Sequence, residues 1–279
     1  MIPICYCSNS KIFHGIVLST LSILKNTKES ITIYLLTMNL SELNEKFKPI
    51  SAVQADALDR IVKEYNSDNK VFLLDVTKEF LTEFSKCKNL KTGYTPYAFT
   101  RLLSDLLDLP SKIIYLDVDT MCCSDISELY NVDIEGWELA MVNDYMGRFW
   151  VRRDYCNSGV ILLNLDEIKK TGLFIKVRER VNKRKMIMPD QSAINFLASR
   201  KMILPCKFNE QRMIKQDTVI KHFCQGMKWY GPFFKVYNYK QWEREKIHKK
   251  LKIFNFDDIF EIFDELDRKY NFKLVGDNV

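Results

Sequence analysis

The stretch that decides the fold is IIYLDVDT, residues 113–120, in which an apolar run ends in two carboxylates. Apolar residues bounded by polar ones are typical of a buried strand. Strand alternation places Asp117 and Asp119 on one side and Val118 on the other. Catalytic groups of open α/β sheets gather where strands end, and two hard oxygen donors there suit Mg²⁺ or Mn²⁺ with a phosphate. The pair predicts a divalent-metal site; the alternative, a solvated acidic turn, leaves costly unpaired carboxylates beside a buried strand.

Outward from this strand, the preceding residues alternate between strand-like and helix-like patterns. This order predicts an α/β fold with a Rossmann-like, mostly parallel nucleotide-binding sheet flanked by helices. We expect one domain, residues 1–235, and a helical C-terminal extension, residues 236–279. The expected strands are residues 2–7, 31–37, 70–76, 112–116, 138–143 and 159–165, and the expected helices are residues 11–25, 41–65, 94–107, 166–183 and 190–198.

Composition bounds the class of protein. The 279 residues, 47% of them hydrophobic, can build one large core, and the scarcity of Gly (9) and Pro (7) argues against disorder and against a turn-rich all-β fold. The eight cysteines show no CxxC spacing, and neither a secretory leader nor an apolar run of about 18 residues is evident. These observations predict a reduced, cytoplasmic protein.

The net charge of +6 gathers in three basic stretches, residues 169–170, 178–185 and 244–252. Solvated helix faces explain such stretches, and contact with an anionic membrane face is the alternative. No nucleic-acid motif accompanies them, so we expect no nucleic-acid partner.

Three further motifs carry polar groups next to apolar runs. Asn157 offers a donor and an acceptor before a strand-like run, and Gly159 permits close approach of the backbone to a ligand. Asp190 follows a proline that suits a helix start. His222 would add the nitrogen donor that shifts a two-carboxylate site towards Mn²⁺, and Lys228 would add a point charge for phosphate. Each motif alone also has an ordinary structural explanation.

Taken in order, these motifs resemble glycosyltransferase family 8, the group of glycogenin and of bacterial lipopolysaccharide galactosyl- and glucosyltransferases. The resemblance runs from the first strand to about Trp229. It implies a GT-A fold, a UDP-sugar donor, Mn²⁺ and retention of anomeric configuration. The motifs that carry it are Arg101-Leu102, Tyr115-Leu116-Asp117-Val118-Asp119, Asn157-Ser158-Gly159, Asp190-Gln191 and His222-Phe223 followed by Lys228.

The resemblance also implies roles for single residues. Asp117, Asp119 and His222 correspond to the metal ligands, and Lys228 to the lysine on the diphosphate. Lys228 is followed directly by Trp229, without the proline that usually stands between them. The positions expected to bind the donor are Cys7, Ser8, Asn9, Arg101, Val118, Asn157, Ser158 and Gly226, and those expected to act around its sugar are Asp190 and Gln191.

The sequence therefore predicts a retaining, Mn²⁺-dependent glycosyltransferase that moves galactose or glucose from a UDP-sugar to a saccharide acceptor of a cell-surface glycan. The acceptor is a saccharide or a lipid-linked saccharide. The aromatic and basic residues 229–252 would then lie against the inner face of a membrane.

Two other readings compete with this one. In a haloacid-dehalogenase-like phosphatase, Asp117 would be the nucleophile and Asp119 the general acid. That fold normally begins with this strand and needs a later strand ending in acids, for which residues 257–258 are a poor match. The second alternative is a non-catalytic binding module on the same fold.

Overall fold

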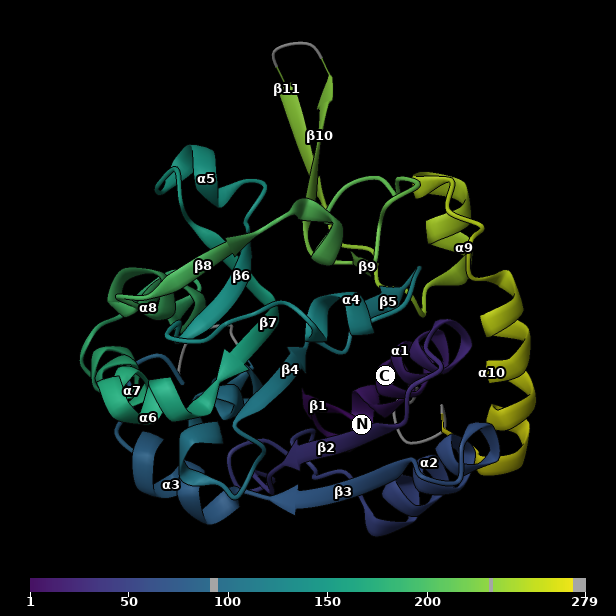
Figure 1. Ribbon diagram of the computed structural model, residues 1–279, viewed down its shortest axis with the longest axis horizontal. Helices are drawn as coiled ribbons and strands as arrows, with labels where there is room; N and C mark the ends of the chain where they lie inside the picture. Colours follow the sequence, from purple (N-terminus) through teal and green to yellow (C-terminus); the bar gives the residue numbers. More distant parts are fainter. Residues whose placement is uncertain (91–94, 231–232, 273–279) are drawn as a thin grey trace.

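A central β-sheet organises the molecule (Figure 1), with strands in the order β3-β2-β1-β4-β7-β6-β8. The computed structural model describes residues 1–90, 95–230 and 233–272, without the side chains of residues 228–230. The strands of this sheet are β1 (Ile2–Cys7), β2 (Ile31–Thr37), β3 (Lys70–Asp75), β4 (Lys112–Leu116), β6 (Leu139–Asn143), β7 (Cys156–Asn164) and β8 (Lys201–Leu204).

Most neighbours in the sheet are parallel. β1 pairs in parallel with β2 and with β4, β2 with β3, and β6 with β8, whereas β7 runs antiparallel to β4 and to β6. The predicted mostly parallel α/β sheet is therefore confirmed. The inversion at β7 brings the start of β7 beside the carboxyl end of β4, where Asp117 follows Leu116.

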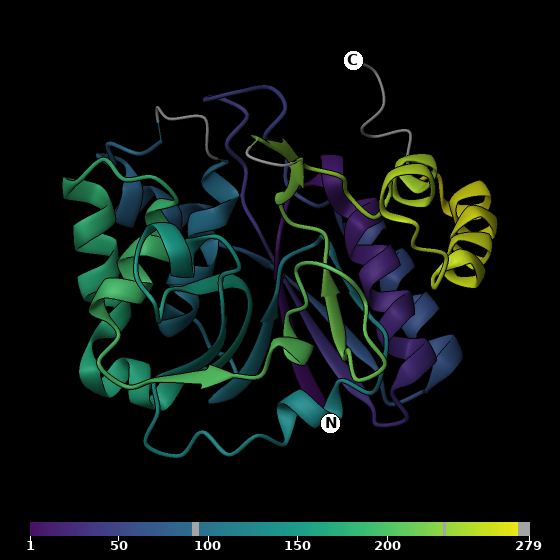
Figure 2. The same cartoon turned by 90° about the horizontal axis from the view of Figure 1, so that it is seen from above.

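Helices cover both faces of the sheet (Figure 2). Along β1, Ile4 and Tyr6 belong to one buried cluster with α1, α2 and α10, while Cys5 and Cys7 belong to another with α3 and α6 to α8. The helical segments are η1 (Ser10–Ile12), α1 (Phe13–Asn26), α2 (Ala52–Tyr65), α3 (Thr77–Phe84), η2 (Pro96–Leu106), α4 (Ser127–Tyr130), α5 (Gly147–Trp150), α6 (Leu165–Thr171), α7 (Leu173–Lys183), α8 (Pro189–Leu197), η3 (Cys206–Phe208), α9 (Arg244–Lys246), η4 (Ile247–Leu251) and α10 (Asp257–Tyr270).

Most expected helices are within two residues of their bounds; the one expected over residues 94–107 is the 3-10 helix η2, with residue 94 outside the described residues, and two others differ more. The helix expected over residues 41–65 begins only at Ala52, because Ser51 and Gln54 form a capping box that starts α2 there. The helix expected over residues 166–183 is divided at Gly172, whose φ of 67° ends α6 in a left-handed cap before α7 begins.

Two small antiparallel pairs were not predicted. β5 (Thr120–Cys122) pairs with β9 (Ile220–His222), and β10 (Gly226–Tyr230) forms a hairpin with β11 (Phe233–Tyr237). Beyond the hairpin the chain is helical, as expected, and α10 packs against α1. The domain boundary after residue 235 falls within β11 and stays a prediction.

Replacing Leu162 with alanine tests the centre of this sheet. Leu162 is fully buried in β7 between Ile114 of β4 and Ala140 of β6. We expect a loss of about 2–5 kcal/mol in the free energy of unfolding, because the cavity cannot close between three paired strands. Urea denaturation measures it. Leu43→Ala, at a leucine that is 62% exposed, is the matched control and should change stability by less than about 0.5 kcal/mol. Equal losses of stability in the two variants would contradict the buried position of Leu162.

Candidate functional site

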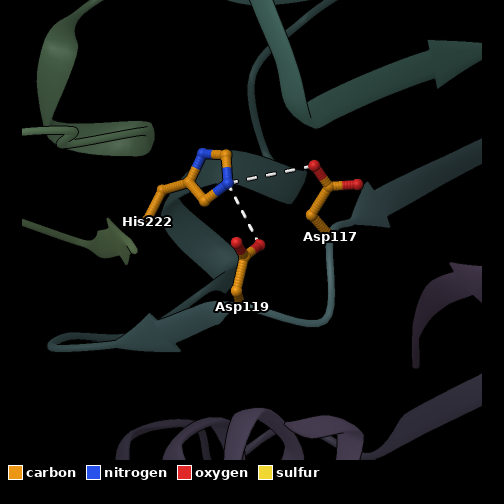
Figure 3. Close-up of side chains that lie close together, drawn as sticks. All are labelled: Asp117, Asp119 and His222. Carbon is orange, nitrogen blue, oxygen red and sulfur yellow. Dashed lines mark hydrogen bonds and ion pairs between the residues drawn. The ribbon is translucent and has the colours of Figure 1, made fainter. Parts of the chain in front are cut away.

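Asp117, Asp119 and His222 form a cluster at the carboxyl end of β4 (Figure 3). The His222 Nε2 lies 3.1 Å from an Asp119 oxygen and 3.8 Å from an Asp117 oxygen. One ligand atom from each residue lies within 4.8 Å of the others. This spacing and the donor set of two carboxylates and one imidazole fit a single divalent ion such as Mn²⁺.

The β5–β9 pair brings the histidine to the carboxylates. Thr120 is opposite His222 in this ladder, and the Phe223 amide donates to the carbonyl oxygen of Asp119 at 2.8 Å. The two halves of the cluster are a hundred residues apart in sequence and are joined by only three strand residues on each side. A strand this short gives no periodic signal, so the sequence suggested His222 as a nitrogen donor by its residue type and matched it to the metal ligands through the resemblance.

Gly159 leaves the space that His222 occupies. A Cβ built on Gly159 would overlap the His222 ring. The same glycine also holds the loop that carries Asp117 and Asp119, because its carbonyl oxygen accepts a hydrogen bond from the Asp117 amide at 2.7 Å. The imidazole therefore takes the space beside this glycine, and the approach of a ligand to its backbone stays a prediction.

Arg101 joins two of the predicted carboxylates. Its guanidinium donates to Asp117 at 3.0 Å, lies 3.5 Å from Asp190 and donates to the Ser158 carbonyl oxygen. The arginine is buried and stacks over the Tyr115 ring at 4.3 Å. Burial raises the pKa of the Asp190 carboxyl, and Arg101 opposes that shift.

Asp144, which was not singled out from the sequence, binds the side chains of two predicted site residues, Asn157 and Gln191. Its carboxylate accepts from Asn157 at 3.0 Å and from Gln191 at 3.2 Å. The side-chain oxygen Oε1 of Gln191 accepts from the Ser158 backbone amide at 3.0 Å. Asp144 directly follows the expected strand 138–143, so the rule that site groups follow strand ends could have found it.

Lys240 is the second residue missed. Its ammonium forms an ion pair with Asp119 and donates to the Phe223 carbonyl oxygen at 3.3 Å. The next residue, Gln241, is fully buried and donates to the Val118 carbonyl oxygen at 2.5 Å. Lys240 and Trp242 are separated by one residue, the spacing that Lys228 and Trp229 lack. This Lys–x–Trp spacing could have identified Lys240 from the sequence.

The charges at the cluster compensate one another. Burial opposes ionisation of Asp119, but the His222 imidazole and the Lys240 ammonium outweigh it and hold the pKa of that carboxyl well below its usual range. Burial also opposes the charged form of His222, yet Cys224 and Asp119 raise the pKa of the imidazole to about 10. Asp119 is therefore ionised throughout the neutral range.

The other predicted positions lie around this cluster or remain apart from it. Cys7 ends β1, and burial raises the pKa of its thiol near Arg101 and Asp117. Ser8 and Asn9 are buried, and Asn9 caps η1. Gly226 starts the β10–β11 hairpin, where a Cβ would overlap the Tyr237 ring. Lys228 is in β10, and its side chain lies outside the described part of the chain.

The phosphatase alternative gains nothing from the structure. Asp257 and Asp258 begin α10 rather than follow a core strand. Asp257 contacts His248 at 2.7 Å, and Asp258 forms an ion pair with Lys25 at 2.5 Å.

The chain matches the model of glycosyl transferase family 8 over residues 3–230. A relative from Haemophilus influenzae named as a glycosyltransferase is 27% identical over 77% of this chain and 68% of its own length. Lipopolysaccharide glucosyltransferase WaaO of Escherichia coli is 23% identical over 75% of this chain and 63% of its own. The match covers only 22% of glycosyltransferase GlyA of Streptococcus pneumoniae.

Solved structures show the same fold. The galactosyltransferase LgtC, in complex with donor and acceptor sugar analogs, superposes with a TM-score of 0.64 at 15% identity. The superposition covers 95% of this chain and 96% of LgtC. The fold is therefore of the GT-A type, as expected.

Gly159→Ala tests the construction of the cluster. The added methyl displaces the His222 ring, so we expect Mn²⁺ affinity to fall about 10-fold or more. The affinity is measured by titrating the protein with Mn²⁺ alone and following the free ion by electron paramagnetic resonance.

Gly136→Ala is the matched control. Gly136 has a φ of 72° and open space at its Cβ, so alanine there strains the backbone without touching His222. Wild-type affinity in Gly159→Ala, or an equal loss in Gly136→Ala, would contradict the arrangement.

Proposed function

Because the chain belongs to glycosyltransferase family 8 and is a glycosyltransferase, we propose that it moves a hexose, galactose or glucose, from a UDP-sugar to a saccharide acceptor with retention of configuration. The observation that carries this proposal is the Asp117–Asp119–His222 cluster, in which Asp119 and His222 are buried, with Arg101 and Lys240 beside it. A nucleotide diphosphate needs such a concentration of cationic groups around it.

We assign the metal to the cluster. Asp117, Asp119 and His222 would hold Mn²⁺, or Mg²⁺ in its place, and the bound ion would supply Lewis-acid stabilisation of the diphosphate leaving group. The protein's own part is to fix the ligands. Tyr115 donates to Asp117 at 2.6 Å, and Arg101 holds the same carboxylate oxygen.

Two lysines compete for the role of a fixed positive charge on the diphosphate. Lys228 was predicted from the resemblance, and Lys240 is supported by its ion pair with Asp119. A lysine that already contacts a metal-binding carboxylate is within reach of phosphate oxygens bound at the same place. We propose Lys240 for this role, and Gly226 stays a predicted position of donor contact. Cys7, Ser8 and Asn9 would face uridine.

The donor sugar would lie between Asp190 and the polar groups held by Asp144. Asp190, paired with Arg101, would accept hydrogen bonds from sugar hydroxyls, and Asn157, Ser158 and Gln191 would complete the pocket. A glutamine is a poor nucleophile, so we favour attack from the leaving-group face, with the leaving phosphate accepting the proton of the acceptor hydroxyl. The transition state has oxocarbenium character.

The acceptor would be a saccharide of a cell-surface glycan, free or lipid-linked, because the named relatives include a lipopolysaccharide glucosyltransferase. Among the described residues, no helix has the length and apolar character needed to cross a bilayer. We propose that the protein works in the cytoplasm at the inner membrane face.

A donor screen tests the proposal. With Mn²⁺ present, we expect slow hydrolysis of UDP-galactose or UDP-glucose and release of UDP, which a coupled assay detects. Asp119→Asn should reduce release by about 100-fold or more, because the charge that holds the metal is lost. Asp166→Asn, at a carboxylate in the first turn of α6, is the control and should retain full activity. Release of inorganic phosphate instead of UDP would overturn the proposal.

Lys240→Met tests the choice between the two lysines. We expect kcat for hydrolysis to fall about 100-fold, because one fixed charge on the leaving group is removed. Lys228→Met measured alongside decides between the residues, and Lys235→Met, opposite Lys228 in the hairpin, is the control. Loss of activity in Lys228→Met alone would assign the role to Lys228.

A further inference from the structure

Two elements project from the upper side of the molecule in Figure 1, the short helix α5 and the β10–β11 hairpin. On α5 and the residue that follows it, Phe149 and Trp150 are each 68% exposed and Val151 is 48% exposed. On the hairpin, Phe233 is 75% exposed and Val236 is 40% exposed. We call these five residues the apolar tips. Large apolar side chains gathered on projecting elements mark an interaction surface.

The hairpin is held firmly at the candidate site. It leaves the core just after His222 and returns just before Lys240, and both of these residues contact Asp119. At its base, Tyr237 stacks on Tyr239 with ring centroids 5.3 Å apart. The base of the hairpin is therefore held next to the metal cluster.

The loop that carries α5 is anchored in the same site. One oxygen of Asp144 accepts from the amides of Met146 and Gly147 at the start of α5, at 3.0 and 2.6 Å. The other oxygen accepts from Asn157 and Gln191. Both elements are thus anchored by residues of the candidate site.

The stretches of sequence that carry the apolar tips, and the residues after the hairpin, are rich in positive charge. Residues 145–153 contain three arginines and no acid, and residues 226–252 contain eight lysines and arginines against two glutamates. The acids within or next to these stretches each pair with one basic residue, so an excess of positive charge remains. Asp154 pairs with Arg152, while Glu243 and Glu245 pair with Lys246 and Lys249. Arg148 lies over the Phe149 ring at 4.6 Å, so charge and apolar surface alternate at the tip itself.

We propose that the apolar tips insert into the interfacial region of a bilayer that contains anionic phospholipids, with the surrounding lysines and arginines on the lipid phosphates. Aromatic side chains favour that region, and basic residues next to them are attracted by the negative surface. The purpose of this surface rests on the proposed function. A bilayer bound at the apolar tips would bring the candidate site close to the head groups that carry a lipid-linked acceptor.

Vesicle flotation tests the proposal without any sugar donor. Wild-type protein should float with vesicles of phosphatidylcholine mixed with phosphatidylglycerol, should float poorly with phosphatidylcholine alone, and should be released by salt. The double variant Phe149→Ser/Trp150→Ser and the single variant Phe233→Ser should each lower partitioning about 10-fold. Val53→Ser is the matched control, at a valine on α2 that is 77% exposed.

Several outcomes would overturn the proposal. These are no flotation of the wild type, equal flotation with both kinds of vesicle, or wild-type flotation of the tip variants. Loss of binding only when Lys249, Lys250 and Lys252 become serine would assign the contact to the basic tail alone. UDP-sugar hydrolysis in the absence of vesicles should be unchanged in the tip variants. Absence of hydrolysis in wild-type protein that still floats would refute the proposed function and leave the lipid surface standing.

Discussion

The site depends on one buried charge, the carboxylate of Asp119. A carboxylate in so little solvent is stable only when cations or donors surround it, and Asp119 has His222 on one oxygen and Lys240 on the other. These partners come from the last third of the chain, whereas Asp119 follows a strand of the first half. Compensation of this one charge therefore determines that the C-terminal segment folds back over the end of β4.

Small residues make that fold-back sterically possible. Gly159 leaves room for the His222 ring, and Gly15 leaves room for Trp242, whose ring would lie 2.7 Å from a Cβ at that position. Trp242 in turn meets the His14 ring edge-on at 4.9 Å. The first helix, the inverted strand β7 and the C-terminal segment thus converge on the loop between Asp117 and Asp119, and neither glycine can gain a methyl group without displacing a ring.

The sequence predicted the parts of the molecule that have a strong local signal. The apolar strand before Asp117, the parallel order and the position of the carboxylates at a strand end follow from residue pattern alone. The start of α2 at Ala52 was missed because residues 41–51 were included in the helix in spite of Pro49, and the capping pair Ser51 and Gln54 marks the true start. Lys240 was missed because Lys228 was assigned instead, although Trp242 has the expected spacing from Lys240; its contact with Asp119, 121 residues away, gives no local signal. The role of Lys240 and the sugar-binding positions stay predictions.

The β10–β11 hairpin has a consequence for how such a chain can change. Its two ends are fixed at one carboxylate, while residues 226–237 between them form a ladder of their own and pair with no strand of the central sheet within the described residues. Insertions, deletions or exchanges in that ladder should leave the metal ligands where they are. The same catalytic centre can therefore be given a different external contact by replacing a single contiguous piece of sequence, so recognition and chemistry can evolve separately.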